Sequence, residues 1–100
     1  MTDAGLPRLT AKERLILELL AGSDPLFGLQ MVELSNGHLK RGTVYATLGR
    51  LEDKGYVTSE QEPRAPGAIG LPRRMYSPTA FGKRVLWAWT TLAQQLATEV

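Results

Sequence analysis

The chain has 100 residues, of which 43% are hydrophobic and 22% charged, a composition that fits one domain with a single modest core. It has no cysteine and one histidine, His38, which excludes a disulfide framework, a cysteine-based zinc site and a paired-histidine centre. The formal net charge of +2 does not by itself indicate nucleic acid. No run reaches the roughly 18 apolar residues of a membrane span, and residues 1–6 do not resemble a signal peptide, so we expect a cytoplasmic protein without membrane contact.

Two short helices are expected in the first third of the chain. Thr10-Ala-Lys-Glu13 matches a capping box, in which each of the two side chains accepts a backbone N–H, and leucines at helical spacing follow it. A second helix is expected over about 28–35, with Leu29 and Val32 facing the core. Asn36-Gly37 is expected to end this helix, because both residues tolerate positive φ.

A third helix is expected over 41–54. Its buried stripe has residues spaced by four and three, namely Val44, Leu48 and Leu51. At about 100° per residue a neighbouring stripe is polar and free of carboxylates, and it consists of Thr43, Thr47, Arg50 and Lys54. Such sorting of charge is typical of a recognition helix, because carboxylates repel phosphates whereas arginine and threonine reach base edges and phosphate oxygens. A merely solvated helix face is the alternative interpretation.

A β-hairpin and a last helix are expected to follow. Residues 56–59 are β-prone and 75–76 predict a returning strand, with a tip over 64–72 that is too rich in proline and glycine for a helix. From 63 to 84 the basic residues are Arg64, Arg73, Arg74, Lys83 and Arg84, and no acid is present. A basic loop beside a basic helix suits contacts with the phosphate backbone. Thr79 is the expected N-cap of the last helix.

The order helix, helix, helix, hairpin, helix predicts a mainly α protein with a small β-hairpin (α+β), arranged as a winged helix-turn-helix. We expect residues 1–78 to form a DNA-binding domain and 79–100 a C-terminal dimerisation helix, in one compact unit. The expected dimer interface has residues spaced by four, three and four, as in a seam between paired helices: Val85, Trp89, Leu92 and Leu96. Trp87 points to another face and is expected to pack on the first helix.

Four sequence blocks between about residues 9 and 86 form a recognisable pattern. The central block is Gly42-Thr-Val-Tyr-Ala-Thr-Leu-Gly-Arg-Leu-Glu-Asp-Lys-Gly-Tyr-Val57; the others are Leu9-Thr10 with Leu17-x-Leu-Leu20, Phe27-Gly28, and Tyr76-Ser-Pro-Thr79-Ala-Phe-Gly82. In this order they resemble the PadR family of bacterial transcription factors. The sequence departs from the family pattern at Ala46, where proline is frequent, and its single C-terminal helix resembles the short branch of the family.

The resemblance implies a transcriptional regulator that binds double-stranded DNA. It favours a Tyr45 hydroxyl near the phosphate backbone, while a tyrosine at the core edge is the alternative. The residues expected at the DNA are Lys40, Arg41, Thr43, Tyr45, Ala46, Thr47, Arg50, Lys54, Arg64, Arg73 and Arg74. The resemblance also implies a candidate site for a flat aromatic effector at Trp87 and Trp89, whereas the sequence itself favours Trp89 as a packing residue of the dimer interface.

The function predicted from the sequence is a dimeric repressor that binds an inverted-repeat operator through helix 41–54 and the wing 56–77. The alternative is a winged-helix module that binds an acidic protein instead of DNA. An enzyme has no candidate site, since the polar residues of 35–38 form no plausible triad and no phosphate loop or dinucleotide fingerprint is present. We therefore expect no catalysis, no cofactor and no metal.

Overall fold

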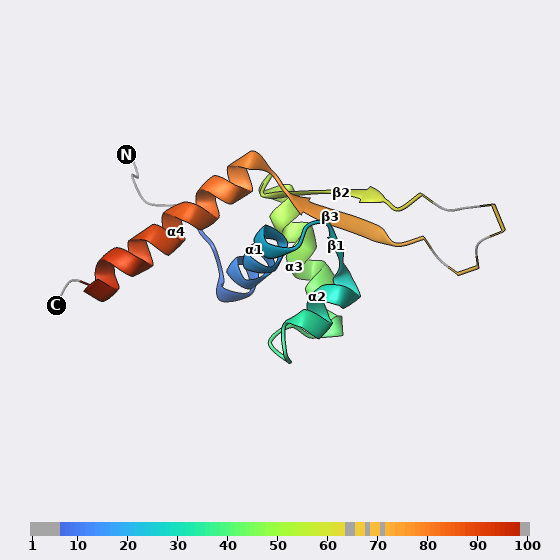
Figure 1. Ribbon diagram of the computed structural model, residues 1–100, viewed down its shortest axis with the longest axis horizontal. Helices are drawn as coiled ribbons and strands as arrows, with labels where there is room; N and C mark the ends of the chain where they lie inside the picture. Colours follow the sequence, from blue (N-terminus) through green and yellow to red (C-terminus); the bar gives the residue numbers. More distant parts are fainter. Residues whose placement is uncertain (1–6, 64–65, 68, 71, 99–100) are drawn as a thin grey trace.

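The computed structural model describes residues 7–63, 66–67, 69–70 and 72–98. Within these ranges the elements are α1 (Ala11–Gly22), β1 (Leu26–Phe27), α2 (Gly28–Leu34), α3 (Arg41–Asp53), β2 (Val57–Gln61), β3 (Arg74–Pro78) and α4 (Ala80–Thr98). Helices α1, α2 and α3 gather in the middle, the β2–β3 hairpin extends from one side and α4 from the other (Figure 1). The predicted α+β fold, a winged helix-turn-helix, is confirmed.

The start of α1 and the end of α2 have the expected causes. The Thr10 hydroxyl accepts the Glu13 N–H at 3.1 Å and the Glu13 carboxylate accepts the Thr10 N–H at 2.9 Å, which completes the capping box. Asn36 and the glycine after it have φ of 52° and 90°, beyond the end of α2. The expected inward face of α2 is wrong in part: Met31 is fully buried, whereas Leu29 is exposed, because the seven-residue helix turns a different side to the core.

The sheet has three antiparallel strands in the order β1-β3-β2. The central strand β3 pairs Tyr76 with Leu26 on one side and with Ser59 on the other. Strand β1 was not predicted, because two residues are too few to show a period of two. It joins the start of α2 to the hairpin and so ties the wing to the helices.

The core lies between the three central helices, the inner face of the sheet and the start of α4. The predicted stripe of α3 is confirmed, since Val44, Leu48 and Leu51 are fully buried. Val85 is also buried, within its own chain, so its expected place in a dimer seam is wrong. Gly82 is buried where a Cβ atom would collide with the backbone carbonyl of Tyr56, which explains why α4 has a glycine at this contact.

The start of α4 is anchored and its end projects beyond the helices (Figure 1). The Thr79 hydroxyl accepts the Gly82 N–H at 2.9 Å, as expected of an N-cap. The expected packing of the tryptophans differs from the structure: Trp89 packs against the core and its indole N–H donates to the Pro7 carbonyl at 2.9 Å, whereas Trp87, expected to pack on the first helix, is 69% exposed. Among the described residues, no helix is long and apolar enough to cross a bilayer.

Candidate nucleic-acid interface

The N-terminal half of α3 is exposed and carries positive charge. Lys40 is the extended N-cap residue, and Leu39 before it is buried, with its N–H bonded to the Ser35 hydroxyl at 2.9 Å. The expected DNA-facing residues of this half are all exposed: Lys40, Arg41, Thr43, Tyr45 and Ala46. The first turn has no acid, and neither Lys40 nor Arg41 forms an ion pair within the part of the chain that the structure describes.

Tyr45 has features of both interpretations left open by the sequence. Its ring covers the start of α2 so closely that a Cβ atom at Gly28 would lie 2.6 Å from the ring. Tyr45 is nevertheless 52% exposed. The ring and its hydroxyl therefore lie against Gly28 of α2, while about half of the residue's surface remains exposed.

The C-terminal half of α3 differs from the expectation. Thr47 is 1% exposed, and its hydroxyl donates to the Thr43 carbonyl at 3.0 Å and accepts from the Arg50 guanidinium at 3.3 Å. Its expected place on an exposed stripe is therefore wrong. Helix α1 packs against α3, and its Glu13 contacts Arg50 and Lys54, which follow Thr47 on the same stripe, so a projection of α3 alone overstates the exposure of this position. Thr47 is unable to reach a ligand outside the protein.

A carboxylate from α1 lies beside the stripe that the sequence predicted to be free of acids. Glu13 has no exposed surface; Lys54 donates to its two carboxylate oxygens at 2.9 and 3.0 Å, and the Arg50 Nε lies 3.7 Å away. Burial raises the pKa of Glu13, but the Thr10 N–H and the cations of Lys54 and Arg50 outweigh burial and hold the pKa below its ordinary value. Lys54 therefore joins α3 to α1 through Glu13, whereas the Arg50 side chain is 54% exposed and still reaches solvent.

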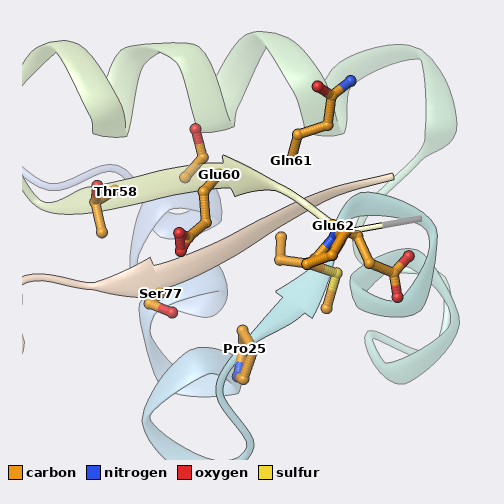
Figure 2. A pocket seen from close by; sticks show the side chains of 9 residues that line it. Pro25, Thr58, Glu60, Gln61, Glu62 and Ser77 are labelled. Atoms are coloured by element: carbon orange, nitrogen blue, oxygen red, sulfur yellow. The ribbon is translucent and has the colours of Figure 1, made fainter. Parts of the chain in front are cut away.

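The two faces of the wing differ. Paired residues of antiparallel strands share a face, so the Ser59–Tyr76 and Gln61–Arg74 pairs lie on the inner face, towards the helices. Figure 2 shows Thr58 and Glu60 on one side of β2 and Gln61 on the other. The outer face has a shallow hollow of about 330 Å³ whose lining includes Glu60 and Glu62. Carboxylates on this outer face do not suit contact with phosphates.

Strand alternation separates the two arginines that the sequence placed together. On the inner face, Arg74 donates to the Ser59 hydroxyl at 3.1 Å, and this hydroxyl donates to the Glu52 carboxylate of α3 at 2.7 Å. Arg74 itself is exposed. Burial and the nearby Glu52 raise the pKa of Tyr76 on the same face. An exposed cation thus lies on the face of the wing that contacts α3.

Arg73 is held by partners of its own chain. Its Nε and a terminal nitrogen donate to the two carboxylate oxygens of Glu62 at 2.8 and 2.9 Å, and its guanidinium lies 4.4 Å from the ring centre of Phe27. These hydrogen bonds lower the pKa of Glu62. The expectation of a basic wing without acids is wrong at this point, because Glu62 lies just before the segment in which acids were counted. Arg64 lies outside the described residues.

The last helix leaves apolar side chains exposed. Leu92 and Leu96 continue the stripe of Val85 and Trp89 beyond the core, and Leu96 is 66% exposed. Trp87 lies on another side of α4, where a shallow hollow also has Ala21 and Leu86 in its lining. Among the described residues, no three acidic or histidine side chains come together to hold a metal ion.

Three packed helices, an exposed helix start without acids and a two-stranded wing define the class of winged helix-turn-helix proteins. Residues 16–88 match the sequence model of the transcriptional regulator PadR-like family. The chain belongs to this family of DNA-binding transcriptional regulators.

Solved structures of several regulators are similar to this chain. A PadR family regulator from Clostridium difficile R20291 has 23% identity over 88% of this chain and 92% of its own, with a TM-score of 0.75, and shows the fold. A putative transcriptional regulator from Thermoplasma acidophilum has 27% identity over 84% of this chain and 81% of its own, with a TM-score of 0.65. Bacillus subtilis PadR, solved with operator DNA, has 25% identity over 77% of this chain and 46% of its own, with a TM-score of 0.67. No curated protein matches in sequence.

Proposed function

We propose that this regulator is a dimeric repressor which binds an inverted-repeat operator through α3 and the β2–β3 wing. The observation that carries the proposal is the exposed start of α3, where Lys40 and Arg41 lie at a helix N-terminus that has no side-chain cap and no acid in its first turn. Such a helix end attracts phosphate through both its cations and its dipole. A major groove admits an α-helix, and Bacillus subtilis PadR, similar over 77% of this chain, has been solved with operator DNA.

The shape of α3 supports close approach to a groove. At about 100° per residue, Asp53, Ala46 and Gly42 point most directly away from the buried stripe, and Gly49 comes next. A Cβ atom at either glycine would meet no other atom within 4 Å, so packing within the chain does not require these glycines. Before Asp53 this face has no long side chain, so the helix backbone can come near the bases there, while Thr43, Tyr45 and Arg50 at its edges reach base edges or phosphates.

The proposed dimer uses the projecting end of α4, within residues 79–100. Leu92 and Leu96 extend the apolar stripe past the core, and monomers rarely leave a contiguous apolar patch in water. A second copy related by a two-fold axis would bury these leucines and set two α3 helices at a fixed separation, which gives the operator the same symmetry. Val85 and Trp89 contribute to the fold of each subunit at the base of this seam.

The effector site that the family resemblance implies stays a prediction. Trp87 is the better candidate residue, because its ring is largely exposed beside a shallow hollow of about 430 Å³. Trp89 packs against the core, and its indole N–H is bonded to the Pro7 carbonyl. A flat aromatic ligand that quenches tryptophan fluorescence in wild type but not in Trp87→Phe would support this site.

Footprinting of the DNA upstream of the gene for this chain tests the proposal. We expect two protected half-sites related by two-fold symmetry, with centres about 10 base pairs or a multiple of this spacing apart. The Arg41→Ala protein, shown by circular dichroism to be folded, should lose this protection. A folded wild-type protein that protects no DNA at low salt but binds an acidic protein would favour the alternative interaction module.

A further inference from the structure

The β2–β3 ribbon leaves the three-stranded sheet at a defined point. Strand β1 pairs with β3 only at Tyr76 and Met75, so the ribbon beyond Met75 has two strands. An isolated two-stranded ribbon is marginally stable, and its twist varies more than that of a wider sheet. A wing that must meet DNA at a fixed angle to α3 therefore needs a contact at this point to set its direction.

Arg73 makes a contact of this kind between the ribbon and the helix-turn-helix unit. Two of its nitrogens donate to both carboxylate oxygens of Glu62, which lies directly across the ribbon on the same face. Its guanidinium lies over the ring of Phe27, 4.4 Å from the ring centre. Phe27 is fixed in turn, because it is the N-cap residue of α2 and its N–H donates to the Gln30 side chain at 2.9 Å. A guanidinium over an aromatic ring together with two hydrogen bonds to one carboxylate restricts the orientation of Arg73 as well as its distance from both partners.

We propose that Arg73, Glu62 and Phe27 form a clamp which fixes the direction of the wing relative to α3, so that Arg73 acts in DNA binding as a positioning residue. This proposal rests on the proposed function. Arg73 differs from Arg74 in two respects that support this role: the nitrogens that would grip a phosphate are already bonded to a carboxylate, and the side chain lies with the acids of the outer face. Arg74, on the inner face, remains the phosphate contact of the wing.

The direction in which one substitution changes DNA affinity separates a positioning role from a phosphate contact. Glu62→Gln removes a negative charge from the wing, which by electrostatics alone would strengthen DNA binding or leave it unchanged. The clamp predicts the opposite, a loss of up to about five-fold in affinity, which corresponds to an exposed ion pair. Glu60→Gln is the matched control, because it removes the same charge from the same face and Glu60 forms no ion pair with another described residue. We expect this control to bind at least as tightly as wild type.

Two further variants test whether the three residues act together. Arg73→Lys keeps the charge but loses the bidentate grip and the guanidinium over the Phe27 ring, so it should bind about as weakly as Glu62→Gln. The double variant with Arg73→Ala and Glu62→Gln should lose no more affinity than Arg73→Ala alone, since residues of one unit are not additive. All titrations use a duplex that carries the footprinted site, and equal urea midpoints exclude a general loss of stability.

The clamp also has a signature without DNA. In the NMR spectrum of the free protein, the Phe27 ring should shield the Arg73 Nε–H, so Phe27→Leu should move that signal downfield. Addition of the duplex should leave this signal near its free position and move the Arg74 signal.

The outcomes distinguish the two proposals. Glu62→Gln binding as tightly as Glu60→Gln would overturn the clamp. So would an Arg73→Lys variant with wild-type affinity together with an Arg73→Ala variant whose slope of log K against log salt is smaller by about 0.9, the mark of a lost phosphate contact. A wild-type protein that binds no duplex would overturn the proposed function, while the Nε–H signals would still decide whether the clamp exists.

Discussion

Replacing Glu13 by glutamine isolates the charge that joins α1 to α3. Glutamine keeps the capping box, because its side-chain oxygen still accepts the Thr10 N–H. It removes the partner of Lys54 and Arg50, which lie 2.9 and 3.7 Å from a carboxylate that has no exposed surface. A hydrogen bond to a charged group contributes about 1.5–3 kcal/mol, and the released cations regain water because both are partly exposed, so we expect a loss of about 1–2 kcal/mol.

Urea and thermal unfolding followed by circular dichroism, at equal protein concentrations, measure this loss. In a domain of this size the expected fall in Tm is roughly 4–16 °C. Glu18→Gln is the control on the same helix, since its half-exposed carboxylate lies 3.6 Å from Arg14 and should change stability by less than about 0.5 kcal/mol.

The stability difference between wild type and Glu13→Gln should also depend on pH in a defined direction. Because the folded protein holds the pKa of Glu13 below its ordinary value of 4.5, the charge stabilises the fold fully above that value. This contribution is lost as the pH falls through the lowered pKa of the folded state. The difference between wild type and Glu13→Gln should therefore be full at pH 7 and shrink in acid. Equal stabilities of Glu13→Gln and Glu18→Gln at pH 7, or a difference that does not shrink, would refute the reasoning.

Four further outcomes are expected. Arg41→Ala should weaken operator binding about tenfold in a titration of labelled duplex, because it removes an exposed cation at the start of α3, and unchanged affinity would exclude it from the interface. Arg74→Ala should reduce the slope of log K against log salt by about 0.9, and an unchanged slope would speak against a phosphate contact. Replacing Leu92 and Leu96 by glutamate should give a folded monomer in sedimentation with much weaker operator binding; a persistent dimer would exclude this seam. Gly82→Ala should lower the urea midpoint strongly, whereas a wild-type midpoint would mean that the backbone gives way at Tyr56.

Local patterns in the sequence predicted the elements well. The capping box, the buried stripe of α3 and the N-cap of α4 depend on residues three or four positions apart, and these relations survive in the fold. Strand β1 was not predicted, because it is defined by its pairing with β3, which lies about fifty residues further along the chain. A period needs several residues to be visible, and β1 has two.

The candidate interface was predicted in outline, and its errors share one cause. A helical projection of α3 treats the helix alone, so it placed Thr47 and Lys54 at the surface. In the fold Thr47 is buried, and the packing of α1 brings the Glu13 carboxylate to Lys54. Likewise, a count of charges along the hairpin took no account of Glu62, whose partner Arg73 lies eleven positions later. The signal that could have found this pair is the register of the hairpin, which places the two residues opposite each other.

The central claim is that two copies of α3, set by a dimer, recognise a symmetric DNA sequence. Selection from a pool of random duplexes with the purified wild-type protein tests this claim directly, without any assumption about target genes. The account predicts an enriched inverted repeat whose half-site centres lie about 10 base pairs or a multiple of this spacing apart. It also predicts that the Arg41→Ala protein enriches the same repeat more weakly, in line with its about tenfold lower affinity. Enrichment of a single unrepeated site, or of no sequence at all by a folded wild-type protein, would contradict it.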